Sequence, residues 1–357
     1  MTMRVLALTR YERLGSSSRV RFYQYFPYLS SRGMEVVSAP FFENRYVVDL
    51  YNRSRISTKL VFTSYARRLS TLAGKGAFDL LWVEKELLPW FPAFMEALFR
   101  ARDIPYVVDY DDAVFHRYDM HPLSLVRTML GKKIDDVMRK AALVVVGNEY
   151  LADRAIRAGA RQVEYLPSVV DVSNYSFKRH QNSSVFSIGW IGSPVTAGYL
   201  GLIGEVVDQL NRESSIRMVL VGAGSQSPFP GISTELLPWS EEVERKFSQK
   251  IDAGIMPLVD GPFERGKCGY KLVQYMAGGI PVVASPIGIN HKIVEHRVNG
   301  YLAESMEDWL TALRSLRDDL ELRAAMGRAG HQKAKKLYNL HATAPRLFDF
   351  LSAAARS

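Results

Sequence analysis

Cysteines and long apolar runs are nearly absent from this chain of 357 residues. Its one cysteine, Cys268, excludes an intramolecular disulfide, which is usual for a protein of a reducing compartment. No stretch of about 20 apolar residues occurs, so we expect no membrane-spanning helix. The apolar run after Met1 is too short for a signal peptide and is typical of a buried first strand. We therefore expect a cytoplasmic protein.

Acidic residues are fewer than basic ones, 37 against 46, which leaves a net charge of +9. Between Arg45 and Lys75, seven basic residues accompany one acid, Asp49, among aromatic and aliphatic side chains. This mixture is typical of a helix on an anionic membrane surface, and equally of a solvated face. We therefore expect peripheral contact with the inner face of the membrane through Arg45–Lys75, with a plain solvated face as the alternative.

Short apolar runs alternate with helical patterns in both halves of the chain. The runs are apolar throughout, which is typical of strands buried on both faces, so the pattern predicts α/β domains with parallel sheets. The expected strands are 4–8, 35–38, 79–83, 106–109, 143–146 and 163–166, then 186–191, 217–221, 253–257 and 281–284. The expected helices are 20–32, 88–102 and 125–140, then 199–212, 270–277, 307–316, 321–326 and a long amphipathic one over about 331–355.

A polar, irregular stretch at 171–184 divides the two halves and is typical of a linker. We expect a Rossmann-like domain over residues 1–170, a second one over 185–330, and a C-terminal helix over 331–357. A cleft between two such domains is a common place for ligands.

The first candidate site is the loop after the first strand. Gly15 permits unusual backbone angles, and Ser17 or Ser18 can cap the following helix. Loop amides at a helix start attract anions, and Arg19 adds a cation. We expect an acceptor or phosphate loop at Gly15, Ser17 and Arg19, with a merely capped turn as the alternative.

The second candidate site is a run of carboxylates, Asp109, Asp111 and Asp112, at the end of an apolar strand. Carboxylates placed there are costly unless they are hydrogen-bonded, paired with cations or bound to metal. They could bind sugar hydroxyls, act as a base or hold a divalent cation. A purely structural loop is the remaining interpretation.

The third candidate site lies in the second half and has two parts. After the strand at 186–191, Gly192 and Ser193 precede a helical pattern, which suits phosphate binding by backbone amides. Later, a glycine-rich basic loop leads into a helix and brings three cations close to its start: Arg265, Lys267 and Lys271. Cations at a helix start favour a diphosphate, and Gln274 lies one turn beyond Lys271. Because this loop has the context of a nucleotide site, we expect no nucleic-acid partner.

These segments, in this order, resemble the retaining glycosyltransferases of family 4, which have the GT-B fold of two Rossmann-like domains facing across a cleft. The resemblance covers nearly the whole chain, and the block that runs from Gly266 to Pro286 is its most specific part. It implies that the second domain binds a nucleoside-diphosphate sugar and that the first binds the acceptor. It also implies that the C-terminal helix packs back on the N-terminal domain.

Two regions depart from the family's pattern. Where the family commonly has two Glu residues separated by seven others, this chain has Gly266 and Gln274. Gln274 can still bond a ribose hydroxyl, but Gly266 cannot replace a carboxylate. The Arg and Lys that the family often has after the first strand of the second domain are also replaced, by residues 192–196. We therefore assign the diphosphate to Arg265, Lys267 or Lys271, with help from the amides around Ser193.

The resemblance further implies transfer with retention of anomeric configuration. Asp111 aligns roughly with a family position that is often His, so we expect it near the reacting sugar, supported by Asp109 and Asp112. Glu295 is expected to contact the donor. The family generally needs no catalytic metal, so we expect no cofactor, with a metal at the aspartates as the alternative.

The sequence thus predicts a glycosyltransferase that moves a sugar from a nucleotide-sugar donor to a glycan or lipid-linked acceptor in bacterial surface polysaccharide synthesis. Two alternatives remain open. A sugar-nucleotide epimerase or hydrolase on the same fold would consume the donor without an acceptor. A non-catalytic nucleotide-sugar-binding protein is favoured by Gly266 and Gln274.

Overall fold

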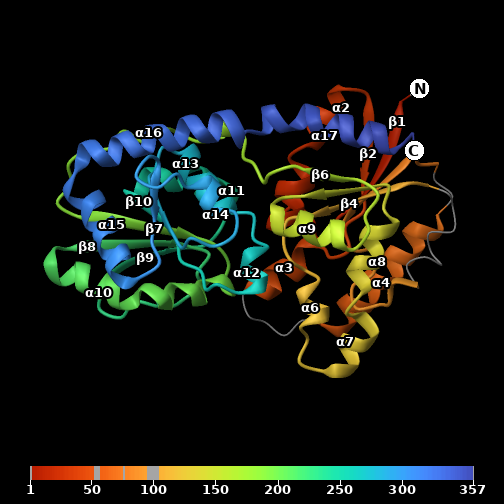
Figure 1. The fold of residues 1–357 in the computed structure, drawn as a ribbon, viewed down its shortest axis with the longest axis horizontal. Coiled ribbons are helices and arrows are strands. Elements are labelled where there is room, and N and C mark those ends of the chain that lie inside the picture. Colours follow the sequence, from red (N-terminus) through yellow and green to blue (C-terminus); the bar gives the residue numbers. More distant parts are fainter. Residues whose placement is uncertain (1, 52–56, 75–76, 95–103, 357) are drawn as a thin grey trace. The chain divides into compact units, whose positions relative to one another are not determined.

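The computed structural model describes residues 2–51, 57–74, 77–94 and 104–356, and it divides into two compact units (Figure 1). Unit 1 comprises Met1–Ser168, Arg265–Cys268 and Leu340–Ser357, and unit 2 comprises Val169–Glu264 and Gly269–Asn339. The stretch expected as a linker therefore falls within unit 2. Four residues of the glycine-rich basic loop fall within unit 1.

Unit 1 contains a parallel six-stranded sheet in the order β2-β1-β3-β4-β5-β6. Its strands are β1 (Met3–Leu8), β2 (Met34–Ser38), β3 (Leu80–Glu84), β4 (Tyr106–Tyr110), β5 (Leu143–Val146) and β6 (Val163–Tyr165). Its helices are α1 (Ser16–Ser18), the π-helix η1 (Arg19–Tyr23), α2 (Phe26–Ser31), α3 (Asn44–Tyr51), α4 (Thr58–Ala73), α6 (His116–Asp119), α7 (Ser124–Leu130), α8 (Lys133–Lys140), α9 (Glu149–Arg157) and α17 (Leu340–Ala354).

Unit 2 contains a second parallel six-stranded sheet, in the order β12-β11-β10-β7-β8-β9. Its strands are β7 (Phe186–Ile191), β8 (Ile216–Val221), β9 (Ser233–Leu237), β10 (Ala253–Met256), β11 (Val282–Ala284) and β12 (Gly300–Leu302). Its helices are the 3-10 helices η2 (Val172–Asn174), η3 (Thr196–Ile203) and η4 (Phe247–Lys250), and α10 (Gly204–Glu213), α11 (Glu241–Lys246), α12 (Pro262–Arg265), α13 (Tyr270–Ala277), α14 (Asn290–Ile293), α15 (Met306–Asp318) and α16 (Leu320–Leu337).

The two sheets confirm the predicted α/β class, and each of the ten expected strands is present within a few residues of its predicted ends. The strands β9 and β12 were not predicted. β9 is only partly buried, since it forms one edge of its sheet, and β12 has three residues, so neither shows the apolar run used to find the others.

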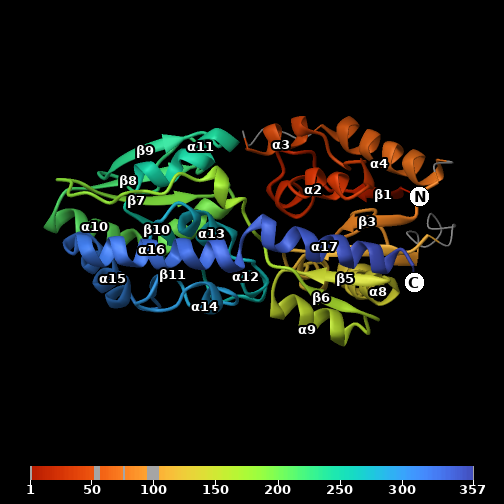
Figure 2. The ribbon, with the colours of Figure 1, turned by 90° about the horizontal axis from the view of Figure 1, so that it is seen from above.

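Several expected helices are divided in the structure. The pattern over 20–32 comprises η1 and α2, and the pattern over 125–140 comprises α7 and α8. The amphipathic stretch expected over 331–355 is the end of α16 in unit 2 followed by α17 in unit 1. Figure 2 shows α17 along the sheet of unit 1, where it packs against α2 and β4. Most of the helix expected over 88–102 lies outside the described residues.

A buried ion pair fixes the interior of unit 1. The Arg21 guanidinium donates two hydrogen bonds to Asp109, at 2.7 and 3.1 Å, and a third to the Leu166 carbonyl at 2.7 Å. Both side chains of the pair are 1% exposed. Arg21 belongs to the π-helix η1, a helix form that commonly marks functional segments. The pair therefore joins the segment after β1 to the ends of β4 and β6.

No helix among residues 2–51, 57–74, 77–94 and 104–356 is long and apolar enough to cross a membrane.

We predict that Arg21→Ala lowers the free energy of unfolding by about 3–5 kcal/mol, because it leaves the Asp109 carboxylate buried without its partner. Thermal and urea unfolding followed by circular dichroism measure this loss. Arg45→Ala is the matched control, because Arg45 is 83% exposed and lies 4.0 Å from Asp49, so its removal should cost less than about 1 kcal/mol. Equal effects of the two substitutions would contradict a structural role for the buried pair.

Candidate functional site

Each sheet has one point where the strand order reverses. In unit 1 the chain passes from β1 outward to β2 and returns to the other side of β1 as β3; in unit 2 it passes from β7 to β8 and β9 and returns as β10. In parallel α/β sheets, ligands bind at the carboxyl ends of the strands that flank such a point. The loops after β1 and β3 and those after β7 and β10 are therefore the places to look.

The loop after β1 differs from its predicted form. Gly15 has an ordinary φ of −70°, and it is needed because a Cβ there would lie 2.4 Å from the Tyr11 Cβ. Neither serine caps the helix; instead, Ser18 Oγ accepts from the Tyr11 N–H at 3.0 Å and donates to Glu84 at 2.6 Å. Arg19 is buried and donates to the Arg13 carbonyl at 3.5 Å. The structure therefore brings only Ser17 of the three predicted residues to the carboxylates described next.

Lys85 follows β3 and meets the carboxylates that follow β4. Its ammonium lies 2.9 Å from Asp111 Oδ1 and donates to Ser17 Oγ at 3.4 Å. Its φ of 66° is in the left-handed region, which for a non-glycine residue costs about 1–3 kcal/mol and is often found at functional sites. The Asp109 carbonyl and the Tyr110 hydroxyl hold this backbone, at 3.1 and 2.8 Å.

Asp111 and Asp112 have opposite pKa shifts, although they are neighbours. Burial alone raises the pKa of Asp111, but the Lys85 ammonium and a hydrogen bond with Ser17 outweigh it and hold the pKa below its usual range. For Asp112, burial prevails over the charges of Lys85 and Lys267, and its pKa is raised. Asp112 Oδ1 is buried and accepts no hydrogen bond within the described part of the chain. Asp111 and the Oδ1 atom of Asp112 can therefore accept hydrogen bonds from a polar ligand.

Asp109, the third predicted carboxylate, lies in the interior and is held by Arg21. Its role in unit 1 is thus structural. Two acidic side chains that the sequence analysis missed also support this edge of the sheet: Glu84, which accepts from the Arg10 N–H at 2.7 Å, and Glu86, which Lys133 contacts at 2.6 Å. Burial alone raises the pKa of Glu86, but Lys133 and Arg10 hold it below its usual range. The charged run Glu84–Glu86 directly after an apolar strand was the signal that could have identified both, as well as Lys85.

Arg265 and Lys267 belong to unit 1, whereas Lys271 belongs to unit 2. Asn148 Nδ2 donates to the carbonyls of Lys267 and Arg265, at 3.0 and 3.5 Å. Between them, Gly266 is buried against Ala113, and a Cβ at Gly266 would lie 2.4 Å from the Ala113 Cβ. Close approach therefore requires glycine at this position.

In unit 2, the loop after β7 and the start of α13 meet at the reversal point. The Lys271 ammonium lies 4.2 Å from the centre of the Trp190 ring, in cation–π geometry. A Cβ at Gly192 would lie 2.4 Å from that ring and 2.8 Å from the Lys271 ammonium. Beside it, the Ser193 N–H donates to Thr196 Oγ1 at 3.0 Å. Gly192, Ser193 and Lys271 thus combine glycine backbone and a cation, as an anionic ligand requires.

Gln274 is buried one helical turn beyond Lys271 and interacts with the Tyr175 phenol. The first turn of the same helix is held by Glu244, which accepts from Tyr270 at 3.1 Å and Trp239 at 2.9 Å. This aromatic and acidic group was not predicted. It fixes the start of α13, and with it the position of Lys271.

Glu295 lies elsewhere in unit 2. It is exposed and precedes the amino end of β12, whose first residue, Gly300, pairs with Val282 at the start of β11. Glu295 is therefore near the amino ends of the strands, whereas Gly192 follows the carboxyl end of β7. The structure therefore separates Glu295 from the other predicted donor residues.

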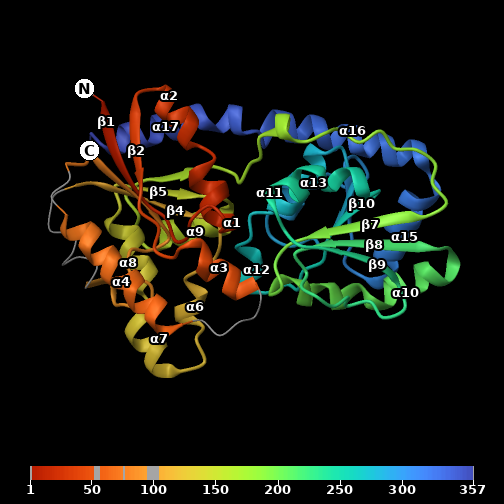
Figure 3. The ribbon, with the colours of Figure 1, turned by 180° about the vertical axis from the view of Figure 1, so that it is seen from behind.

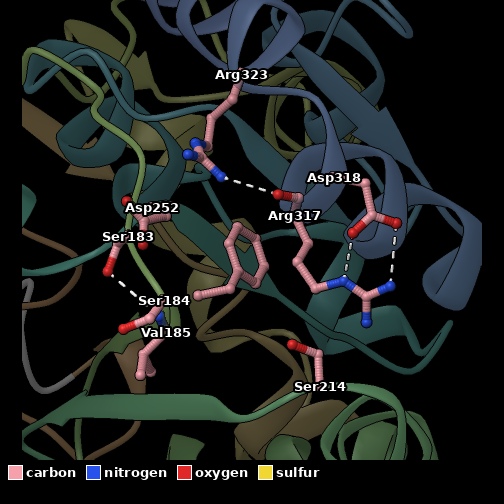
Figure 4. Close-up of a pocket in the computed structure, with 9 residues that line it drawn as sticks. Ser183, Ser184, Val185, Ser214, Asp252, Arg317, Asp318 and Arg323 are labelled. Carbon is pink, nitrogen blue, oxygen red and sulfur yellow. Dashed lines mark hydrogen bonds and ion pairs between the residues drawn. The ribbon is translucent and has the colours of Figure 1, made fainter.

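A cavity of about 220 Å³ also lies away from the reversal point, near the amino ends of β7 and β8 (Figure 4). Its charged groups are engaged with neighbours: Arg317 contacts Asp318 at 2.7 Å, and Asp252 accepts from the Ser187 N–H at 2.9 Å. We therefore do not assign the donor to this cavity. In the described part of the chain, no three His, Cys, Asp or Glu side chains are grouped as metal ligands would be.

Comparisons with known proteins bear on the fold and on the domain in the second half of the chain. The sequence profile of the family described as glycosyl transferases group 1 matches residues 182–319, a segment that includes Gly192, Lys271 and Gln274. No curated protein sequence matches the chain.

Solved structures match the fold over nearly the whole chain. Sucrose-phosphate synthase from Thermosynechococcus elongatus has a TM-score of 0.73 at 16% identity, covering 99% of this chain and 100% of that one. HepE from Anabaena, in complex with UDP and glucose, has a TM-score of 0.70 at 17% identity, covering 98% and 100%. A glycosyltransferase from Rickettsia africae has a TM-score of 0.68 at 11% identity, covering 100% and 99%.

At these identities the structural matches establish the fold, and the profile match establishes the kind of domain that residues 182–319 form. The chain therefore has the GT-B fold of these glycosyltransferase structures, and its residues 182–319 match the domain of group 1 glycosyl transferases.

Proposed function

We propose that this glycosyltransferase transfers a sugar, with retention of configuration, from a uridine-diphosphate sugar to a glycan or lipid-linked acceptor in bacterial surface polysaccharide synthesis. Unit 2 binds the donor and unit 1 binds the acceptor. The observation that carries the proposal is the Lys271 ammonium over the Trp190 ring, beside Gly192, at the reversal point of unit 2.

The donor class follows from what this edge of unit 2 offers. A leaving diphosphate develops negative charge, and fixed cations and backbone amides stabilise it more in the transition state than in the ground state. Lys271 supplies the cation, and Gly192 leaves room beside it, since a Cβ there would meet the Trp190 ring and the Lys271 ammonium. Gln274 is close enough along α13 to contact the ribose.

Uridine is chosen because of the solved relatives. HepE has been crystallised with UDP and glucose and with UDP-glucose, and TarM from S. aureus with UDP, fondaparinux and α-GlcNAc-glycerol. Transfer with retention is supported by the resemblance of the sequence to family 4. The TarM complex also supports a glycan-like acceptor.

The acceptor assignment rests on Lys85, Asp111 and Asp112 at the reversal point of unit 1. Asp111 is held ionised by Lys85 and accepts a hydrogen bond from an acceptor hydroxyl. Lys85 is a positioning residue, because it acts through Asp111. Its strained backbone is held by neighbouring groups, so the ammonium is in place before the ligand binds.

We predict that one class of nucleotide sugar raises the melting temperature of the wild type and that Lys271→Ala abolishes this shift. A thermal-shift screen with UDP-, GDP- and ADP-sugars, followed by sugar release from the donor that binds, measures both binding and turnover. Lys246→Ala is the matched control, because Lys246 is exposed and pairs with Glu242 at 2.7 Å. Absence of a shift with every nucleotide would refute the donor site. A shift without turnover would favour the binding-protein alternative.

We predict that Lys85→Met lowers kcat for sugar release by about 10²-fold and moves the acidic limb of the pH–rate profile upward. In the wild type, Lys85 holds the pKa of Asp111 below its usual value, so Asp111 loses its charge only at strongly acidic pH. Without the ammonium, burial raises that pKa, and Asp111 becomes protonated closer to neutrality. The control is Lys140→Met, at an exposed lysine of α8. Identical pH profiles for the Lys85 variant and the wild type would exclude the role of Lys85.

We predict that Gly266→Ala destabilises the protein by about 1–3 kcal/mol, because the added methyl meets the Cβ and backbone of Ala113. The family's glutamate would therefore not fit at this position either. Gly198→Ala is the control, since a Cβ there has no neighbour within 4 Å. Thermal unfolding of the two variants measures the difference. A Gly266→Ala variant as stable as the control would contradict the tight packing. The absence of the family's glutamate would then not be explained by a lack of space at this position.

A further inference from the structure

We propose that the α6–α7 hairpin of unit 1, with Trp90 beside it, docks the protein onto an anionic lipid bilayer. The surface is formed by Trp90, Met120, Leu123, Leu125 and Met129, and we call it the hairpin surface. Figures 1 and 3 both show α7 below the sheet of unit 1, with α6 leading to it.

The side chains of the hairpin surface are large, apolar and between 49% and 68% exposed. They occur within a short stretch: four of them lie between residues 120 and 129. Leu125 and Met129 are one helical turn apart on α7, so they share a face, while Leu130 faces the interior. An exposed apolar group of this kind on a soluble protein usually marks a contact with another surface.

The hairpin is held in its shape by its own hydrogen bonds. Arg127 Nη1 donates to the carbonyls of His121 and Pro122, at 2.6 and 2.9 Å, across the turn between α6 and α7. The Leu123 N–H donates to His121 Nδ1 at 3.1 Å. These hydrogen bonds fix the turn that carries the exposed leucine and methionine side chains.

Trp90 gives a second, independent observation. Its ring lies 5.8 Å from the His121 ring, and its backbone N–H donates to the Tyr118 hydroxyl at 3.1 Å. Its φ of 64° is left-handed, a strained conformation for a bulky residue. The structure thus keeps a half-exposed tryptophan next to the hairpin at an energetic cost. Tryptophan is enriched where one end of a side chain is apolar and the other is wet, as at a membrane interface.

Charge decides the kind of partner. The exposed charged residues between 116 and 132 are all basic: Arg117, Arg127 and Lys132. The one acid, Asp119, is ion-paired with Arg154 at 2.9 Å and with His116 at 2.8 Å. An apolar surface bordered by exposed cations fits the interface of a bilayer that contains anionic lipids, where each nearby Lys or Arg contributes about 1 kcal/mol.

This surface differs from the segment between Arg45 and Lys75 that the sequence analysis selected. In that segment Arg68 is buried and donates to the Thr9 carbonyl at 2.7 Å, and Arg67 contacts Glu43. Two of its basic side chains thus serve packing within unit 1. Residues 52–56 and 75–76, which carry three more, lie outside the described residues.

The hairpin also has a consequence for the acceptor, which rests on the proposed function. α6 begins four residues after Asp112, so the carboxylates at the end of β4 continue directly into the hairpin. A hairpin seated in the lipid interface therefore keeps this edge of unit 1 close to the bilayer. That position favours the lipid-linked form of the acceptor over a free glycan.

Sedimentation with lipid vesicles tests the docking, without nucleotide present. We expect the full chain to bind vesicles of phosphatidylcholine mixed with phosphatidylglycerol, to bind pure phosphatidylcholine weakly, and to dissociate as salt is raised. The triple variant Leu123→Ser, Leu125→Ser, Met129→Ser should bind at least about tenfold more weakly, because apolar area is no longer buried in the interface. The control is Ile156→Ser, on α9 of the same unit, where Ile156 is 63% exposed; its binding should match the wild type.

A second variant keeps the test decisive if the triple variant folds poorly by circular dichroism. Arg117→Gln with Lys132→Gln should weaken binding to the anionic vesicles by about tenfold or more and leave the apolar surface intact. Wild-type levels of vesicle binding in both variants, or no vesicle binding by the wild type, would overturn the proposal. A concentration-dependent dimer that the triple variant abolishes would assign the surface to a second copy instead. Failure of nucleotide binding with vesicle binding retained would refute the proposed function alone.

Discussion

The buried pair of Arg21 and Asp109 is the contact on which the arrangement of unit 1 depends. Three strands are involved: Arg21 lies in the segment that follows β1, Asp109 lies in β4, and the Leu166 carbonyl follows β6. Taking both charges out of water is expensive, and only the bidentate geometry and the third hydrogen bond offset that cost. Such a pair specifies one arrangement of the three segments, since any shift would leave a charge unpaired.

The Arg21–Asp109 pair also positions Lys85 and Asp111, two residues of the proposed acceptor site. Asp111 is two residues beyond Asp109, and the Lys85 N–H donates to the Asp109 carbonyl. Ser17 and Ser18 directly precede η1, in which Arg21 lies. The loops after β1, β3 and β4 are thus aligned by one buried contact. At the reversal point of unit 2, the Trp190 ring lies against the Lys271 ammonium, and Gly192 leaves room for both.

The sequence predicted the sheets better than the details of either site. Continuous apolar runs are strong signals, because strands buried on both faces must be apolar throughout. Gly15 was expected in an acceptor or phosphate loop because glycine permits unusual backbone angles, whereas its φ is ordinary and the glycine makes room for Tyr11. Packing of this kind depends on contacts between distant residues, which spacing along the chain does not encode. The charged run that contains Lys85 was visible in the sequence, but its contact with Asp111 could not be inferred, because it forms only when β3 and β4 lie side by side.

The division between α16 and α17 has a consequence for how the protein is made. Residues 340–354 complete unit 1, where Tyr25 and Thr343 are joined by a hydrogen bond of 3.1 Å and Arg346 donates to the Tyr165 carbonyl at 2.7 Å. The ribosome, however, synthesises all of unit 2 before it reaches them. During translation, the face of unit 1 that α17 covers therefore stays exposed until α17 has been made. By then unit 2 already has its full sequence. The unit synthesised first is the last to be finished.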